Sequence, residues 1–240
     1  MMRKVGLWVG ITVALGWSSG VGAGVIFSES FESPVVSTFP GTNGNWLNYG
    51  ITTPGQTGSS VSRGVSFTGD SGQTWTVDSG NIDLTNQNEW VAQQGVQSID
   101  MNGFEPGSIF TSVSLSPGSY ELSFYLSKHS ALSGDGTLEV EWDGASVGSS
   151  PYVVNWSTSQ NSMNWTQVVV ELLVPKSGAP TSSHEIRFTS LTTTTAGGFA
   201  SAGATIDSVS LKQVPEPSTA LLLGLGLTGL AAKGRRRNRS

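Results

Sequence analysis

The residue types that most often perform catalysis are few in this chain and do not form recognisable catalytic motifs. His129 and His184 are the two histidines, and they lack the spacing of a metal site, so we expect both to be surface or strand residues. No G-x-S-x-G sequence presents a serine nucleophile. Cysteine is absent, which excludes disulfides and thiolate metal ligands. Gly224 to Gly229 fits G-x-G-x-x-G, but it lies in an apolar C-terminal run with no preceding strand, so it predicts no dinucleotide site.

Pairs of acidic residues are the remaining candidates for catalysis. Glu139 and Glu141, or Asp78 and Asp83, could act as the acid and base of a glycosidase. Such enzymes hold their carboxylates in a deep cleft, which a sequence cannot locate. We therefore expect a protein that is not an enzyme, and we keep a polysaccharide hydrolase as a less favoured alternative.

Tryptophan is abundant between the two ends of the chain, and its flat ring is suited to stacking on the C–H faces of sugars. The same residue is commonly part of a core, which is the more frequent role for any single one. Trp75 and Trp165 lie in strand-like segments and are expected in the core. Trp46 and Trp156 are set among Asn, Gly and Ser, so we predict that they stack on a glycan, together with Tyr49 and Tyr152.

The central region is strongly acidic. Between residues 24 and 217 there are five basic residues against all 17 acidic ones, which gives a formal charge of −12. A body of this charge repels nucleic acid and anionic lipid headgroups, so neither is an expected partner.

Short segments with alternating apolar residues must position these side chains, and they indicate β-strands. Residues 119–127 place Tyr120, Leu122, Phe124 and Leu126 on one face, and residues 109–115 alternate similarly, so we predict a hairpin across the turn at 116–118. Asp143-Gly144 predicts a second hairpin, with a type I′ turn, between residues 137–142 and 145–147. The remaining predicted strands are 65–68, 75–77, 98–101, 165–174, 184–191 and 204–212. About eight strands at this spacing predict one all-β, two-sheet sandwich.

The N-terminus has the three parts of a secretory signal peptide. A cationic head (residues 1–4) precedes an apolar run (5–17) and a stretch of small residues that ends at Ala23. We predict that signal peptidase cleaves between Ala23 and Gly24. An N-terminal membrane anchor is the alternative, but this run is shorter than the roughly 20 residues that a spanning helix needs.

The C-terminus combines a rigid motif, an apolar run and a basic end. Pro215, Glu216 and Pro217 precede an apolar helix predicted at 219–232 and a basic tail at 233–240, which the positive-inside rule keeps in the cytoplasm. This arrangement resembles the PEP-CTERM sorting signal, which exosortase reads in Gram-negative bacteria that make exopolysaccharide. The resemblance implies transient anchoring in the inner membrane and cleavage near the Pro-Glu-Pro motif. A permanent membrane anchor is the alternative.

The body between these signals resembles the choice-of-anchor C family. Residues 29–34, 75–84, 95–103 and 204–211 follow the order of that family's sequence blocks, although Ser30 stands where related sequences usually have Gly, and the loop 41–64 is long. The resemblance implies a galactose-binding-like jelly-roll β-sandwich. In carbohydrate-binding relatives of this kind the first and last strands often share a structural Ca²⁺, which here implies Glu32 and Asp207 as ligands. The alternative is that Glu32 caps a turn and Asp207 bonds a neighbouring strand, with no ion.

We therefore expect a signal peptide at 1–23, a jelly-roll domain at 24–213 and a PEP-CTERM signal at 214–240. The mature protein is expected at the cell surface, in the extracellular matrix or secreted, in association with exopolysaccharide or other glycans. A structural or protein-binding matrix module that recognises no sugar is the principal alternative.

Overall fold

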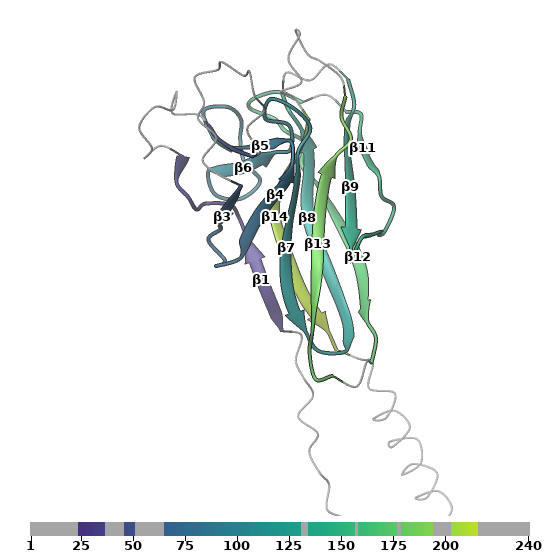
Figure 1. Ribbon diagram of the computed structural model, residues 1–240. Helices are drawn as coiled ribbons and strands as arrows, with labels where there is room; N and C mark the ends of the chain where they lie inside the picture. The colour runs from purple at the N-terminus through teal and green to yellow at the C-terminus, as the bar shows by residue number, and fades with distance from the viewer. Residues whose placement is uncertain are drawn as a thin grey trace, which may run out of the picture.

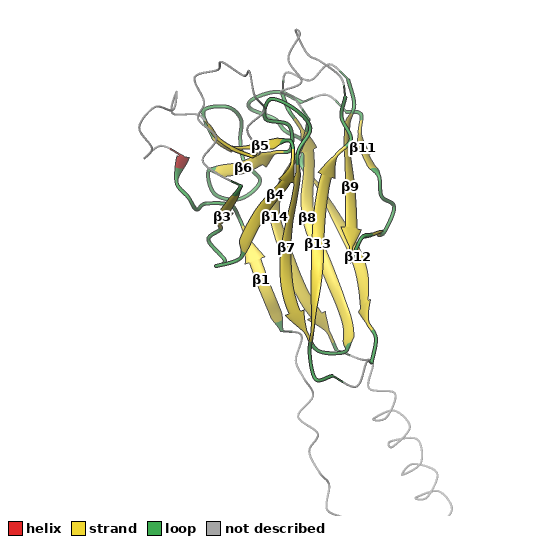
Figure 2. Ribbon diagram, in the orientation of Figure 1, coloured by secondary structure: helices red, strands yellow, loops and turns green. Residues whose placement is uncertain are grey.

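The computed structural model describes residues 24–36, 46–50, 65–130, 134–156, 158–176, 179–193 and 203–215. These residues form strands and loops, with one short helical turn at Val36 (Figure 2). The strands are β1 (Val25–Glu29), β2 (Trp46–Gly50), β3 (Ser66–Thr68), β4 (Thr74–Ser79), β5 (Asn81–Asn86), β6 (Gln97–Asp100), β7 (Ser108–Leu115), β8 (Gly118–Lys128), β9 (Gly136–Trp142), β10 (Ala145–Ser146), β11 (Tyr152–Val154), β12 (Thr166–Val174), β13 (Ser182–Ser190) and β14 (Ala204–Val214). Within the described ranges, no helix has the length and apolar character needed to span a membrane. The signal peptide, most of the loop 41–64 and the predicted helix 219–232 lie outside these ranges.

The strands form two seven-stranded sheets (Figure 1). The first sheet has the order β12-β8-β14-β6-β5-β2, and β1 also pairs with β14. The second has the order β10-β9-β13-β7-β4-β3, and β11 also pairs with β9. The prediction of an all-β, two-sheet sandwich is confirmed.

Alternation along the strands explains how the two sheets pack. In β8 the side chains of Tyr120, Leu122, Phe124 and Leu126 are all buried, as the period of two predicts. Residues from both sheets join one continuous hydrophobic core. In a chain without disulfides this core supplies the apolar burial that offsets the entropy of folding.

Aromatic rings join the two sheets at the centre of the core. Phe124 of the first sheet lies edge-on to Phe188 of the second, with 5.2 Å between ring centroids. Phe188 in turn lies 6.2 Å from Trp75, and all three side chains are fully buried. The prediction that Trp75 is a core residue is confirmed. The same prediction for Trp165 is wrong, because Trp165 is only half-buried and donates its indole N–H to the Val91 carbonyl at 3.0 Å.

The predicted hairpin of residues 109–115 and 119–127 is wrong. β7 pairs with β4 and β13 in the second sheet, whereas β8 pairs with β12 and β14 in the first. The chain at 116–118 therefore crosses between sheets, and the apolar faces of the two strands look toward each other across the core. Alternation identifies the buried face of a strand but not its hydrogen-bonded neighbour.

The second predicted hairpin is confirmed. β9 and β10 pair antiparallel, with Ala145 opposite Trp142. Asp143 and Gly144 both have positive φ, at 50° and 77°, as a type I′ turn requires.

The first and last strands are neighbours, as the resemblance implied. β1 runs antiparallel to β14, from Val25 opposite Lys212 to Glu29 opposite Val209. The turn that follows β1 is thereby held beside the middle of β14, where Asp207 lies.

Candidate functional site: an aromatic and acidic pocket

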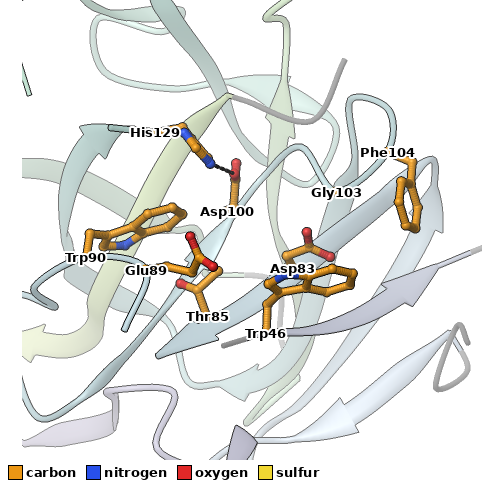
Figure 3. Close-up of a pocket in the computed structure, with 9 residues that line it drawn as sticks. All are labelled: Trp46, Asp83, Thr85, Glu89, Trp90, Asp100, Gly103, Phe104 and His129. Atoms are coloured by element: carbon orange, nitrogen blue, oxygen red, sulfur yellow. Dashed lines mark ion pairs between the residues drawn. The ribbon is translucent and has the colours of Figure 1, made fainter. Parts of the chain in front are cut away.

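A pocket of about 170 Å³ lies beside β2, β5 and β6 in the first sheet (Figure 3). It is lined by aromatic, acidic and small polar residues, namely Trp46, Asp83, Thr85, Glu89, Trp90, Asp100, Gly103, Phe104 and His129. Trp46 begins β2, Asp83 and Thr85 belong to β5, and Asp100 ends β6. The other residues lie in the loops that follow β5, β6 and β8.

Strand register places two carboxyl groups next to each other. Asp83 of β5 is directly opposite Asp100 of β6, and Asn48 of β2 is opposite Asp83 on the other side. Asn48 donates a hydrogen bond of 2.8 Å to Asp83 Oδ1. Like charges directly opposite each other in a sheet are destabilising, so this pair is not explained by the stability of the fold.

Burial shifts the pKa values of both aspartates upward. Loss of solvent raises the pKa of Asp83 to about 7, the hydrogen bond from Asn48 acts in the opposite direction, and the charge of Glu89 adds to the rise. Burial also raises the pKa of Asp100 well above its usual value, and the charges of Asp83 and Glu89 contribute. Asp100 is 1% exposed. Perturbed carboxyl groups in a pocket are characteristic of functional sites.

His129 closes one side of the pocket and does not neutralise Asp100. Its Nε2 atom lies 3.9 Å from Asp100 Oδ2, which is too long for a hydrogen bond (Figure 3). Burial lowers the pKa of His129, although the charge of Glu89 acts to raise it. At neutral pH, therefore, the imidazole is uncharged and the contact with Asp100 is not an ion pair.

Two tryptophans contribute different surfaces to the pocket. Trp90 is 2% exposed, donates its indole N–H to Ser98 Oγ at 2.9 Å, and lies edge-on to the His129 ring, so it forms a fixed wall. Trp46 is half-buried and contacts the Phe104 ring edge-on, with 6.2 Å between centroids. The face of Trp46 is the better candidate for contact with a ligand.

The other predicted stacking residues lie outside this pocket. Tyr49 is 4% exposed and packs against Phe67, so burial removes it from the candidates. The reason is the period of two in β2, which places Trp46 on the pocket face and Tyr49 on the core face. Tyr152 and Trp156 are half-buried and pack against the core. Their predicted contact with a glycan stays a prediction.

The acidic pairs considered from the sequence do not meet in one cleft. Asp78 pairs with Arg187 rather than with Asp83. Glu141 also lies near Arg187, at 3.8 Å, and Glu139 accepts a hydrogen bond from Ser146. Asp83 instead joins Glu89 and Asp100, a grouping that the sequence did not reveal because it depends on the pairing of β5 with β6.

Glu32 and Asp207 hold one loop, residues 93–97, from two sides. Glu32 Oε1 accepts hydrogen bonds from the N–H groups of residues 96 and 97 at 2.7 and 2.9 Å. Asp207 Oδ2 accepts from those of residues 93 and 94 at 2.8 and 3.0 Å. Asp207 is fully buried, and loss of solvent raises its pKa to about 7 despite these donors. The loop leads from Trp90 to β6, so this anchoring positions two walls of the pocket.

A second carboxylate pair fixes the turn after β1. Glu29 is fully buried and accepts hydrogen bonds of 3.0 Å from the N–H groups of Phe31 and Asp70. Asp70 accepts in return from the N–H groups of Ser30 and Glu32, at 3.2 and 3.1 Å. Burial raises the pKa of Glu29 to about 7. Burial would also raise the pKa of Asp70, but its hydrogen bonds with Glu29 and Ser30 outweigh this effect and lower it.

These contacts bear on the calcium ion predicted at Glu32 and Asp207. Calcium takes about six to eight oxygen ligands, and two carboxylates need further acidic or carbonyl groups. In the described part of the chain, no group of three or more His, Cys, Asp or Glu side chains is arranged to hold a metal ion. Peptide N–H groups already compensate Glu32 Oε1 and Asp207, so the residues present do not require a cation.

Comparison with known proteins identifies the C-terminal signal. Residues 213–237 match the model of the PEP-CTERM protein-sorting motif. This motif indicates an exported protein that is sorted to the cell envelope or surface. No curated protein matches the chain.

Solved structures include distant carbohydrate-binding modules. The CBM22-1 xylan-binding domain from Paenibacillus barcinonensis Xyn10C is 18% identical, with 81% of this chain and 97% of that chain covered and a TM-score of 0.43. A family 35 carbohydrate-binding module from Clostridium thermocellum is 14% identical, with 57% and 90% covered and a TM-score of 0.39. At this similarity the matches carry no information about a ligand.

The anchoring of loop 93–97 can be tested at Gly95. Its φ is +68°, and a β-carbon there would collide with the Glu32 carboxylate. The collision would break the hydrogen bonds that Glu32 accepts from this loop, and hydrogen bonds to charged groups contribute about 1.5–3 kcal/mol. We therefore expect Gly95→Ala to lower the free energy of unfolding by at least about 1 kcal/mol more than Gly72→Ala does. Gly72 is the matched control, since its φ is +84° but no atom lies within 4 Å. Urea unfolding measures both variants, and equal losses would contradict the proposed role of Glu32.

The buried carboxyl groups predict greater stability at mildly acidic pH. A carboxyl group whose pKa is higher in the folded state than in the unfolded state stabilises the folded state. This stabilisation is complete below the pKa of the unfolded state and is lost as the pH rises through the pKa of the folded state. For Glu29, Asp83 and Asp207 that window runs from about 4 to about 7, and the raised pKa of Asp100 acts in the same direction. The lowered pKa of His129 makes the folded state more stable as the pH rises, but this is one group against the four carboxyl groups.

We therefore expect the free energy of unfolding to fall by at least about 2 kcal/mol between pH 5 and pH 8. Denaturant unfolding at the two values measures this change. Asp83→Asn removes one of the four groups and should make the dependence shallower. A free energy that is constant or rises over this range would show that these carboxyl groups do not titrate as described.

Proposed function

We propose that this protein is an exported surface protein that binds glycans without catalysis through the pocket beside β2, β5 and β6. The observation that carries the proposal is the half-buried ring of Trp46 at a pocket that also contains carboxyl and hydroxyl groups. A sugar presents apolar C–H faces and polar hydroxyl groups, so it needs an aromatic surface beside hydrogen-bonding partners. Asp83, Glu89 and Thr85 supply such partners here.

The size of the pocket limits how much of a glycan it can hold. Its volume of about 170 Å³ is below the roughly 300–1,000 Å³ of typical ligand pockets. We therefore propose that it receives one sugar ring or a chain end, with the rest of the polymer outside. A module that binds one sugar ring or a chain end of a polymer does not need a long groove on its surface.

The C-terminal motif supports the route to the cell surface. We propose that signal peptidase cleaves between Ala23 and Gly24, that residues 219–232 anchor the chain transiently in the inner membrane, and that exosortase cleaves near Pro215, Glu216 and Pro217. The glycan would then be exopolysaccharide or another cell-surface polysaccharide. The formal charge of −12 between residues 24 and 217, from five bases and 17 acids, argues against nucleic acid as a partner. The finer assignment of the body as a galactose-binding-like jelly roll of the choice-of-anchor C family remains part of this proposal.

Substitution of two tryptophans tests the binding site. We expect Trp46→Ala to weaken binding of the full-length chain to polysaccharide from the producing strain by about tenfold, because an aromatic contact contributes about 0.5–1.5 kcal/mol beyond its buried area. Trp142→Ala is the control, because Trp142 stacks on His184 in the second sheet and does not line the pocket, so its loss should leave the affinity within twofold.

Titration calorimetry measures both affinities, and assay of reducing ends detects cleavage. Equal losses for the two variants would place the binding site elsewhere. No binding to any polysaccharide would favour a structural or protein-binding matrix module. Release of reducing ends that Asp83→Asn abolishes would establish a hydrolase instead.

The calcium prediction has its own test. Since peptide N–H groups compensate Glu32 and Asp207, we expect the unfolding temperature of the full-length chain to be the same in millimolar Ca²⁺ and in excess EDTA. A structural ion would raise the unfolding temperature in Ca²⁺, because a ligand that binds only the folded state stabilises it. A rise that Asp207→Asn removes would establish the ion at this pair.

A further inference from the structure

We propose that Ser182, His184 and Asp143 form a second site, at which the Ser182 hydroxyl attacks and hydrolyses uncharged esters of small carboxylic acids, such as acetates. None of the three residues lines the pocket beside β2, β5 and β6. The inference therefore goes beyond the proposed function and does not rest on it.

The three side chains form a continuous series of hydrogen bonds. His184 Nε2 lies 2.7 Å from Ser182 Oγ, and His184 Nδ1 lies 2.7 Å from Asp143 Oδ2. Because a carboxylate only accepts hydrogen bonds, Nδ1 carries the proton of the neutral ring, which leaves Nε2 to accept the hydrogen bond of the hydroxyl. A hydroxyl, a base and a carboxylate that orients the base are the arrangement that activates a serine nucleophile.

Strand pairing brings these groups together. Ser182 and His184 are two residues apart in β13, so their side chains share one face. Asp143 lies in the turn after β9, which pairs with β13 (Figure 1). Asp143 Oδ1 accepts a hydrogen bond of 2.8 Å from the N–H group of Glu185, and Oδ2 is left to the imidazole. No sequence motif reports this arrangement, because 41 residues separate Asp143 from His184.

Trp142 holds the imidazole in place. The two rings are stacked, with 4.9 Å between centroids and 7° between planes. The His184 side chain is 10% exposed, whereas that of Asp143 is 44% exposed and Ser182 is half-buried. The base is therefore fixed, while the hydroxyl remains within reach of a small molecule.

The peptide N–H of Ser183 is placed to stabilise the negative charge that develops on the ester oxygen. Asp143 exchanges hydrogen bonds with the C=O and N–H groups of Glu185, so these groups point away from β7. The direction alternates along a strand, so the peptide groups of Ser183 point to the same side. β9 pairs with β13 from Ile186 onward, so in the described ranges no strand covers that side at Ser183. The N–H group of the residue after a nucleophile is a known donor to such an oxygen.

The reaction balances with water as the second reactant. Ser182 Oγ forms a bond to the carbonyl carbon and passes its proton to His184 Nε2, which gives it to the alcohol as the ester C–O bond breaks. Water then attacks the acyl group on Oγ, with His184 as the base. The bond to Oγ breaks, the carboxylic acid leaves and the hydroxyl regains its proton.

The surroundings of the hydroxyl favour a small, uncharged acyl group. Thr181 and Ser183, on either side of the nucleophile, are exposed and polar, so they offer little apolar surface to a long acyl chain. The formal charge of −12 between residues 24 and 217 disfavours anionic esters.

Labelling of the full-length chain with a fluorophosphonate tests the nucleophile. An activated serine displaces fluoride from this probe, and mass spectrometry of peptides locates the adduct. We expect the label on Ser182, and Ser182→Ala should abolish it. Ser183→Ala is the matched control, because it removes a neighbouring hydroxyl but keeps the peptide N–H, and it should be labelled at the rate of the unsubstituted protein.

His184→Gln tests the base. It should slow labelling by at least about tenfold, because a general base contributes about 10²–10⁴-fold to a rate. Hydrolysis of p-nitrophenyl acetate should fall in the same way in His184→Gln and should be lost in Ser182→Ala. Circular dichroism checks that each variant is folded.

Asp143 is a positioning residue in this site, and its test includes the tautomer of the imidazole. Asp143→Asn keeps the size of the side chain, but its amide group can donate to Nδ1 and so favour the other tautomer. We expect at least about tenfold slower labelling and loss of the downfield proton NMR signal of the Nδ1–H group. Asp135→Asn removes the same charge at an exposed position and should change neither measurement.

The outcomes separate the nucleophile from the hydrolysis. Label that is spread over several serines, or equal labelling rates in His184→Gln and the unsubstituted protein, would overturn the activated nucleophile. Label on Ser182 without hydrolysis of p-nitrophenyl acetate above the Ser182→Ala level would overturn the hydrolysis alone. Neither result bears on the glycan pocket.

Discussion

The pairing of the first strand with the last is the constraint on which the site depends. Because β1 lies against β14, the turn that contains Glu32 is held near Asp207, and the two carboxylates grip opposite ends of the loop 93–97. That loop begins after Trp90 and continues into β6, which ends at Asp100. The position of two pocket walls is thus set by contacts between the ends of the folded body, which are more than 170 residues apart in the sequence.

The same design places an unusual number of acidic groups out of water. Glu29, Asp100 and Asp207 are each at most 1% exposed, and removal of a carboxylate from water is unfavourable unless donors or cations compensate it. For Glu29 and Asp207 the compensation comes from peptide N–H groups, which fix loops in return. Asp100 also accepts a hydrogen bond from a peptide N–H group, that of Asn102 at 3.0 Å, and Asp83 accepts one from the side chain of Asn48 at 2.8 Å. These are the two buried aspartates that line the pocket.

Local patterns in the sequence predicted the strands and turns better than they predicted which strands pair with each other. The alternation in β8 and the Asp143-Gly144 turn of the second hairpin are properties of neighbouring residues, and both predictions were confirmed. The prediction of a hairpin between residues 109–115 and 119–127 was wrong, because the same alternation also fits a chain that crosses from one sheet to the other. Trp46 was chosen because of its polar neighbours, and it lines the pocket. Tyr49 was chosen for the same reason, but it lies three residues further along the same strand, so its side chain points to the opposite face and into the core. The pair Asp83 and Asp100 depends on the register of β5 with β6, which no local pattern reports.

The direction of the strands gives the pocket a position suited to a surface protein. β14 runs from Ala204, beside Lys128, to Val214, beside Ser119, so the end of β8 that leads to His129 is opposite the end where β14 finishes. Gln213 donates a hydrogen bond to the carbonyl of Gly24, so both ends of the folded body leave from one pole (Figure 1). Eleven residues of strand separate that pole from the pocket, a distance of about 30 Å at roughly 3.3 Å per residue. A chain that is attached through its C-terminal motif therefore presents the pocket away from the point of attachment. Binding of a distant polymer then requires no rearrangement of the sandwich.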